Sequence, residues 1–476
     1  MHKVNSITLP SKICKLAKLS NYNRGVASNA RVTPSKVHAD VSEEGIKVCS
    51  IDNPNITTGA SRIALVVRGG PVYEHFTKLG LSHLIRRSFG LASDEFTAVN
   101  LNRHLEYLGG KANVIGTKEH IIYTIDCAPN LLPRAGELIS FMASDNAYLP
   151  WEVKRITKKL MAYDIEYLQR IDGETLCSEL LHEAAFGAHA SGTKLGRSLY
   201  SSIDKLGAYT DEDIFQFHDS MFSASNMSIG VLNASNDLNS LDLIKEFKEN
   251  LKIKNSPNKL SEPQHTFIGN DVRKEINNQT HVNVKLAYYV PSGRSSVSQM
   301  IALGIASSAL GENRVQYGTH KDSILGKTCG AEGFDESLVS AQPLYQIHSN
   351  HSLFGVSLKG TCGLATNARL NAIATSLKNI ATKGLTQADF DKGKAQFLMN
   401  YCQIVEDPYL NIVENAIDNL ENGKINSFDE ISKIIDSITL DEVNNHLKKV
   451  LGSGHRAMAV TGCKTTAISP LAVIPK

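Results

Sequence analysis

Residues Leu79–Arg87 read L-G-L-S-H-L-I-R-R, and this stretch decides how the rest of the chain is interpreted. The segment His83-Leu84-Ile85-Arg86-Arg87 fits the frame H-x-x-E-H, in which two histidines and a glutamate on one helix form a catalytic zinc site. His83 is kept, but Arg86 stands in place of the general base and Arg87 in place of the second ligand. A guanidinium stays protonated, has no lone pair to donate and repels a cation. The stretch therefore predicts the helix of a metal site that has lost its chemistry.

The composition is that of a globular protein without a membrane-spanning segment. The chain has 476 residues, 42% of them hydrophobic and 21% charged, which indicates two or more domains. Its net charge of +2 gives no argument for a nucleic-acid partner. No apolar run approaches the ~18 residues that a transmembrane helix needs. The eight cysteines show no C-x-x-C spacing, so we expect free thiols in a reducing compartment rather than disulfides or a structural zinc site.

The N-terminal segment, residues 1–39, is basic, and the first acidic residue of the chain is Asp40. Within it, a helix from Ser11 to Leu19 would carry lysines on one side and apolar residues on the other. Frequent Ser and Asn with no acidic residue are typical of a mitochondrial transit peptide, and we expect cleavage between Arg24 and Lys36. The alternative is a disordered basic tail.

The mature chain shows two similar halves. Each half ends with an acidic helix start, an amphipathic helix, a short polar turn and a strand, and the separation of Asp213 from Val231 equals that of Glu442 from Val460. Short β-branched strands alternate with helical patterns in both halves. We therefore predict the α+β class, with two copies of a unit of roughly 200 residues in which helices pack on a mixed or antiparallel sheet. The expected divisions are an extension (1–39), a first domain (40–245), a linker (246–273), a second domain (274–465) and a C-terminal tail (466–476).

Two segments carry a resemblance to a known family. They read S-R-I-A-L-V-V-R-G-G-P-V-Y-E-H-F-T-K-L-G-L-S-H-L-I-R-R, from Ser61, and L-E-Y-L-G-G-K-A-N-V-I-G-T-K-E-H-I-I-Y-T, from Leu105. With the duplication, they resemble the pitrilysin (M16) metallopeptidase family over about residues 41–465. The resemblance implies that the two domains form a bowl-like half of an assembly.

The resemblance also assigns the positions of the degenerate site. The first zinc histidine of the family falls on His83, the catalytic glutamate on Arg86 and the second histidine on Arg87. The third ligand, a glutamate in the family, falls near Asp164, and Glu166 is the alternative register. We therefore expect no catalytic residue, no metal and no cofactor, and carboxylates within reach of one or both arginines, because a buried guanidinium needs an anionic partner.

Other catalytic patterns are incomplete. The pair His182-Glu183 has Phe186 where the forward motif H-E-x-x-H needs its second histidine. His348 and His351 lack a nearby set of carboxylates, and we expect them to be exposed residues of a hairpin. The chain has no Ser-His-Asp frame, no Walker loop and no G-x-G-x-x-G, so the sequence gives no support for an enzyme.

For a member of this family without the zinc site, the resemblance implies one of two roles. The first is a structural core subunit of the ubiquinol–cytochrome c reductase (complex III), peripheral on the matrix side of the mitochondrial inner membrane. Its partners in that dimeric complex would be the homologous core protein 1, cytochrome b, cytochrome c1 and the Rieske protein. The second is the non-catalytic, presequence-binding subunit of a mitochondrial processing peptidase. That subunit carries a dense glycine-rich loop, whereas residues 303–318 hold only Gly304, Gly311 and Gly318, and this difference favours the structural role.

Overall fold

The computed structural model describes most of the chain after the basic N-terminal segment. The described residues are 36–41, 45–52, 59–187, 194–235, 238–253, 260, 265–276, 279–311, 323–329, 339–463 and 465–475. The expected cleavage region between Arg24 and Lys36, much of the expected linker and residues 312–318 of the glycine-poor stretch lie outside them. No helix in the described ranges is long and apolar enough to cross a membrane.

The first half is built on a sheet with the strand order β1-β2-β6-β3-β5-β4. Its strands are β1 (Lys36–Val41), β2 (Lys47–Asp52), β3 (Ser61–Arg68), β4 (Lys111–Gly116), β5 (His120–Cys127) and β6 (Met227–Asn233). Its helices are α1 (Leu81–Ser88), α2 (Ala98–Tyr107), α3 (Leu132–Ala143), α4 (Pro150–Glu152), α5 (Lys158–Arg170), α6 (Gly173–Phe186), α7 (Asp211–Met221) and α8 (Ser240–Asn250). A π-helical turn, Val153–Thr157, joins α4 to α5.

The second half has a sheet with the order β7-β11-β8-β10-β9. Its strands are β7 (Asp271–Glu275), β8 (Val282–Val290), β9 (Val339–Ile347), β10 (Ser352–Gly360) and β11 (Arg456–Gly462). Its helices are α9 (Val297–Leu310), α10 (Ile324–Cys329), α11 (Gly363–Lys383), α12 (Gln387–Glu406), α13 (Pro408–Asn422), α14 (Phe428–Ser437) and α15 (Leu440–Gly452).

The two sheets share one topology, which confirms the predicted duplication. The order β2-β6-β3-β5-β4 corresponds strand for strand to β7-β11-β8-β10-β9, and in each sheet the first of these pairs is parallel and the others are antiparallel. The acidic helix starts seen in the sequence are capping boxes: Thr210 with Asp213 on α7, and Thr439 with Glu442 on α15. The fold is therefore two α+β units with helices packed on mixed sheets, as predicted.

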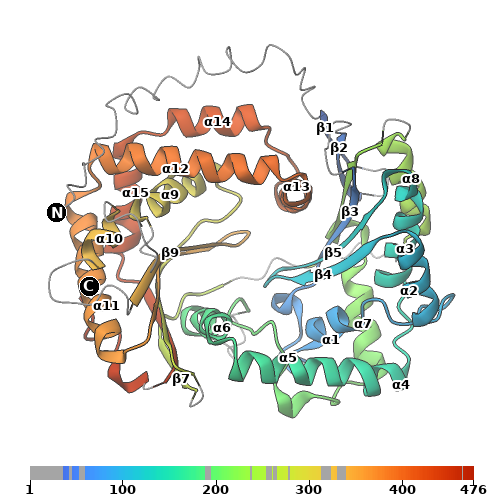
Figure 1. Cartoon of the computed structure of the whole chain (residues 1–476), viewed down its shortest axis with the longest axis horizontal. Helices are drawn as coiled ribbons and strands as arrows, with labels where there is room; N and C mark the ends of the chain where they lie inside the picture. The colour runs from blue at the N-terminus through green and yellow to red at the C-terminus, as the bar shows by residue number, and fades with distance from the viewer. Residues whose placement is uncertain are drawn as a thin grey trace, which may run out of the picture.

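Each half covers one face of the other half's sheet with a helix. Helix α6, from the first half, packs on β11 and β8, and helix α13, from the second half, packs on β6, β2 and β3. In Figure 1, α13 lies beside β2 and β3. Helix α6 lies between α5 and the second half of the chain. The apolar contacts of α13 are made by Ile412, Ala416 and Leu420 against strand residues such as Val66 and Ile122. Because α6 and α13 hold corresponding places in the two units, the exchange is reciprocal.

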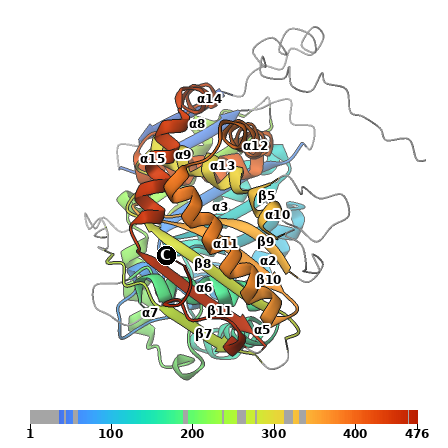
Figure 2. The same ribbon diagram turned by 90° about the vertical axis from the view of Figure 1, so that its left-hand side faces the viewer.

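Regular structure also occupies both ends of the expected linker, residues 246–273. Helix α8 continues to Asn250, and Phe247 is buried against the core of the first half with Leu251 just beyond the helix. Strand β7 begins at Asp271 and pairs with β11 in parallel. Figure 2, turned by 90°, shows β7, β11 and β8 side by side. Some of the charged residues in this stretch therefore belong to a helix, α8, and to an edge strand, β7.

Candidate functional site

Helix α1 is oriented by a carboxylate and a glycine at its start. The Glu74 carboxylate accepts hydrogen bonds from the backbone N–H groups of Gly80 (2.8 Å) and Ser82 (2.7 Å), which are otherwise unpaired at a helix N-terminus. Gly80 has a φ of +102°, and a Cβ there would lie 2.5 Å from the Cβ of Ser201, so only glycine fits. Leu81 and Leu84 pack into the core, which directs His83 toward the interior.

His83 is buried, with 1% of its surface exposed, and both of its ring nitrogens are engaged. Nδ1 accepts a hydrogen bond from the backbone N–H of Ser201 (3.2 Å). The proton is therefore on Nε2, which lies 2.9 Å from Asp164 Oδ2 and donates to it. Burial lowers the pKa of His83, with Arg86 and Arg87 adding to this effect against the opposing contribution of Asp164. A neutral imidazole in this state has no free lone pair for a metal.

Asp164, on α5, faces His83 and receives a second donor. Arg87 Nε donates to Asp164 Oδ2 and Arg87 Nη2 to Oδ1, which is a bidentate ion pair. Burial alone would raise the pKa of the Asp164 carboxyl, but the hydrogen bonds from His83 and Arg87 outweigh it and lower the pKa. Glu166, the alternative register, is exposed and pairs with Arg170 at 3.0 Å. Asp164 is therefore the carboxylate that lies beside the histidine of the frame.

Arg86 has a different environment. Its Nη2 donates to the carbonyl oxygen of Leu199, and its guanidinium lies 6.0 Å from the centre of the Tyr200 ring. A Cβ on Gly116, in the edge strand β4, would lie 2.5 Å from Arg86 Cδ, so the arginine fills the space between α1 and β4. Burial lowers the pKa of Arg86. The prediction of a carboxylate within reach of one or both arginines is confirmed by Arg87, while Arg86 has a carbonyl instead.

The residues present do not fit a zinc ion. One would-be ligand, His83, uses both nitrogens within the protein, and another, Asp164, is bound by Arg87. A catalytic zinc needs three protein ligands and an open position for water. Within the described ranges, no cluster of three His, Cys, Asp or Glu side chains is arranged to hold a metal ion.

The expectation that His348 and His351 are exposed hairpin residues is wrong. The turn of the hairpin of β9 and β10 contacts α6, because His348 Nε2 lies 3.1 Å from Nε2 of His182 on that helix. His351 Nδ1 lies 2.8 Å from the Tyr289 hydroxyl. Burial lowers the pKa of His182 to about 3, with nearby Lys118 contributing, and lowers the pKa of His348 well below its usual range. These histidines belong to the contact between the halves, which neither half's sequence pattern reveals.

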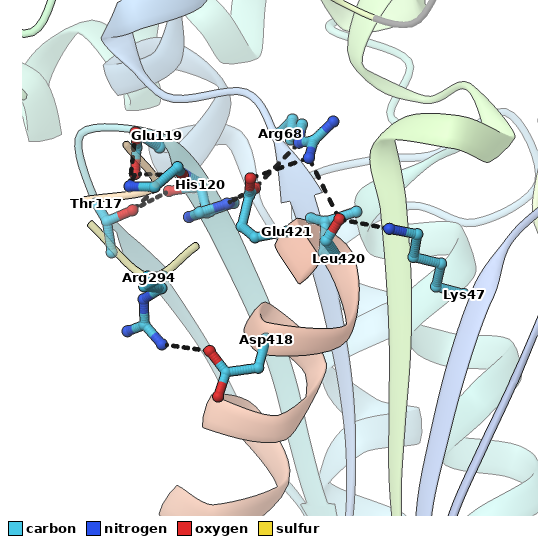
Figure 3. Close-up of polar contacts among 10 residues, drawn as sticks. Lys47, Arg68, Thr117, Glu119, His120, Arg294, Asp418, Leu420 and Glu421 are labelled. Atoms are coloured by element: carbon cyan, nitrogen blue, oxygen red, sulfur yellow. Dashed lines mark hydrogen bonds and ion pairs between the residues drawn. The ribbon is translucent and has the colours of Figure 1, made fainter. Parts of the chain in front are cut away.

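A second polar contact between the halves lies at the end of α13 (Figure 3). Glu421 accepts hydrogen bonds from Arg68 (3.0 Å to each carboxylate oxygen) and from His120 Nε2 (2.7 Å). Although burial alone would raise it, the pKa of Glu421 is strongly lowered by these partners. Lys47 donates to the Leu420 carbonyl at 2.7 Å. No local motif in the sequence indicates this network, because each of these contacts joins residues more than 300 positions apart.

Comparison with known proteins places this geometry in a family. Residues 47–199 match the family model described as insulinase (peptidase family M16), and residues 208–397 match the peptidase M16 inactive domain. The chain therefore belongs to the M16 peptidase family, which confirms the resemblance seen in the sequence.

Two sequence relatives and one solved structure show which members of the family the chain is similar to. The chain is 24% identical over 424 residues to the human protein cytochrome b-c1 complex subunit 2, mitochondrial, covering 88% of each. It is 24% identical over 431 residues to the probable mitochondrial-processing peptidase subunit alpha-1 of Arabidopsis thaliana, covering 88% of this chain and 81% of the relative. A chain of complex III2 from Candida albicans, with Inz-5 bound, shares the fold with a TM-score of 0.75 at 15% identity, over 90% of this chain and 96% of that chain.

Proposed function

We propose that this protein is a non-catalytic structural subunit of the mitochondrial ubiquinol–cytochrome c reductase, the cytochrome b-c1 complex. The observation that carries the non-catalytic part is the ion pair of Arg87 with Asp164, which puts a guanidinium where the family's chemistry needs a ligand. The likeness to cytochrome b-c1 complex subunit 2 from human and mouse, at 24% and 23% identity, supports the choice of complex. In this role the chain contributes surfaces rather than reacting groups.

The proposal includes location and partners. The subunit would sit on the matrix side of the inner membrane, in contact with a homologous core protein 1 and with cytochrome b, cytochrome c1 and the Rieske protein in a dimeric complex. Permanent interfaces of this kind bury about 2,000 Å² or more. The proposed first domain (40–245) and second domain (274–465) would form a bowl-like half against the related subunit. Cleavage of the presequence would fall before Lys36, because β1 begins at that residue and pairs with β2.

A second candidate is the non-catalytic subunit of a mitochondrial processing peptidase. It is supported by the Arabidopsis relative, which matches this chain at the same identity as the human subunit 2. That role relies on a flexible glycine-rich loop, and the corresponding stretch, residues 303–318, has three isolated glycines. The structural role is therefore the better supported of the two.

Native electrophoresis separates the two candidates. Mitochondria are extracted with mild detergent, resolved on a native gel and probed for this chain and for haems b and c. The proposal predicts that the chain migrates with both haems in a large complex. A soluble heterodimer with presequence-cleaving activity and without haem would overturn it in favour of the processing peptidase.

A further inference from the structure

Helix α5 exposes a continuous line of large apolar side chains. These residues are Ile156 in the π-helical turn before α5, Leu160, Tyr163 and Tyr167 on α5 itself, and Ile171 at its C-terminal cap. They are hereafter called the α5 stripe, and every one is exposed, Tyr163 and Ile171 to 65%. Their spacing of four, three, four and four residues places them on one side of the helix. Monomeric proteins rarely leave such an apolar line in water, and it marks an interaction site.

The stripe is additional to the face that α5 already buries. Met161, Ile165 and Leu168 turn into the protein, as does Asp164 of the degenerate site. The rings of Tyr163 and Tyr167 lie nearly parallel, with centroids 6.2 Å apart, on the outer side. Figure 1 shows α5 running along the rim of the first half between α4 and α6. The helix thus offers a second apolar side that its own half does not cover.

The duplicated unit provides an internal comparison. Helix α12 precedes α13 as α5 precedes α6, so the two helices hold corresponding places. The exposed large apolar side chains of α12 are Met399 and Ile404, which do not form a continuous line. The duplicated fold therefore does not require an apolar stripe on this helix, and the stripe is a property of the first half alone.

The charges beside the stripe define its partner. Arg155 and Lys159 each precede a stripe residue by one position, and both are exposed. Among the described residues, no carboxylate forms an ion pair with Arg155 or Lys159, whereas Glu166, which precedes the stripe residue Tyr167, is neutralised by Arg170. Unpaired cations that flank an apolar line on a helix favour a partner helix with apolar positions at the same spacing and carboxylates at its edges.

We propose that the α5 stripe is the docking surface for an acidic amphipathic helix of the homologous M16 subunit in the same assembly. The inference rests on the proposed function, because that function supplies a permanent, related partner. The side chains of the two helices would interdigitate and bury the stripe. The partner's carboxylates would neutralise Arg155 and Lys159. The inactive site would thereby lie directly beneath a subunit contact, since Asp164 is on the same helix.

A photo-crosslinking experiment in the intact complex tests the docking surface. The photoreactive residue p-benzoylphenylalanine replaces Tyr163 in one preparation and Gln396, on the equivalent helix α12, in a control. The expected product from position 163 is a crosslink to the homologous subunit, mapped by mass spectrometry to a helix that carries acidic residues beside apolar ones. Crosslinks to a second copy of this chain, to lipid, or to a non-acidic segment would each overturn the inference.

Substitutions then measure the strength of the contact. Leu160→Asp with Tyr163→Asp should lower the amount of homologous subunit that co-purifies with this chain by about tenfold or more, as expected when charges enter a packed helix contact. Met399→Asp on α12 is the matched control and should leave it unchanged. Thermal unfolding of each isolated variant checks folding, and Arg155→Glu with Lys159→Glu provides a second variant that adds no charge to the apolar line. Undiminished co-purification of both stripe variants would overturn the inference.

The outcomes keep this inference separate from the proposed function. If the chain fails to migrate with haems b and c while position 163 still crosslinks to an acidic helix of an M16 partner, the choice of complex is wrong and the docking surface stands. If the chain migrates with the haems and the stripe variants assemble normally, the docking surface is wrong and the proposed function stands.

Discussion

Arg87 binds Asp164 through two hydrogen bonds, one to each carboxylate oxygen. The resemblance seen in the sequence assigns the family's second histidine to Arg87 and its third ligand to the region of Asp164, and in this structure an internal ion pair joins these two residues. His83 completes the arrangement by donating to the same carboxylate. These contacts join α1 to α5 without a metal ion, which agrees with the proposed structural role.

Removing this carboxylate should destabilise the protein. Asp164→Ala leaves the buried Nε2–H of His83 without an acceptor, and an orphaned buried donor costs about 1–3 kcal/mol. The free energy of unfolding from urea titration is the measurement. Glu166→Ala is the matched control on the same helix, because its pair with Arg170 is exposed, and it should change the stability by less than about 0.5 kcal/mol. Equal effects of the two substitutions would contradict the structural role of Asp164.

Stability should fall as the pH drops below about 6.5, because of the histidines between the halves. His265 lies near the rings of Phe186, on α6, and His351. Burial lowers the pKa of His182 to about 3 and that of His265 to about 4. In the unfolded chain these groups take up a proton near the ordinary histidine pKa of 6.5, whereas the folded chain keeps them neutral until the pH reaches the lowered pKa. Each therefore costs up to about 1.4 kcal/mol per pH unit below that value, until the folded pKa is reached.

Urea titrations at pH 7.5 and pH 5 measure this slope. His182→Gln should reduce the slope of the unfolding free energy against pH by the contribution of one proton, about 1.4 kcal/mol per pH unit. The reason is that the glutamine side chain does not titrate. His75→Gln is the control, since His75 is exposed on the surface of the first half, and its slope should match that of the unsubstituted protein. A slope unaffected by His182→Gln would exclude the buried histidine as its source.

The ion pair at the end of α13 should hold the halves together. Glu421→Ala leaves Arg68 buried without its carboxylate, and breaking a buried pair costs about 3 kcal/mol or more. Hydrogen exchange should show the largest loss of protection in α13 and in β2, which it covers. Glu406→Ala at the exposed end of α12 is the control and should leave the exchange pattern unchanged. A loss of protection confined to the last turn of α13, with the rest of that helix and β2 unchanged, would contradict the account.

Because the covering helices are exchanged, neither half should fold alone. A fragment of residues 36–253 lacks α13 and leaves Ile51, Val66, Ile122 and Leu232 of its sheet exposed. We expect it to aggregate or to bind the dye ANS, and to recover solubility when co-expressed with residues 260–475. A monomeric fragment with cooperative unfolding would show that α13 is dispensable for the first half.

Local patterns in the sequence predicted most of the fold. Thr210 and Thr439 cap helices whose apolar residues recur at helical spacing. Helices α7 and α15 therefore begin where the sequence predicts them. The buried strands β3 and β5 are β-branched and bounded by turns, which is why their ends are clear. Equal spacing in the two halves then indicated the duplication, which the shared strand order bears out.

The features that depend on distant contacts could not be predicted in this way. The exchange of α6 and α13 is set by complementarity between helices and sheets in different halves, and both helices look locally like ordinary amphipathic helices. The sequence predicts an exposed His348 because a hairpin pattern gives no sign of a contact with His182 in the other half. At the candidate site, the family resemblance indicated Asp164, but the engagement of both nitrogens of His83 depends on Ser201, far along the chain.

Zinc binding tests the central claim most directly. The protein is dialysed against micromolar zinc, passed through a chelating column and analysed for metal, beside the variant Arg86→Glu with Arg87→His, which restores the ligand frame. The account predicts essentially no zinc in the unsubstituted protein, because Arg87 occupies Asp164, and up to about one zinc per chain in the variant. One tightly bound zinc per chain at His83 of the unsubstituted protein would contradict the account.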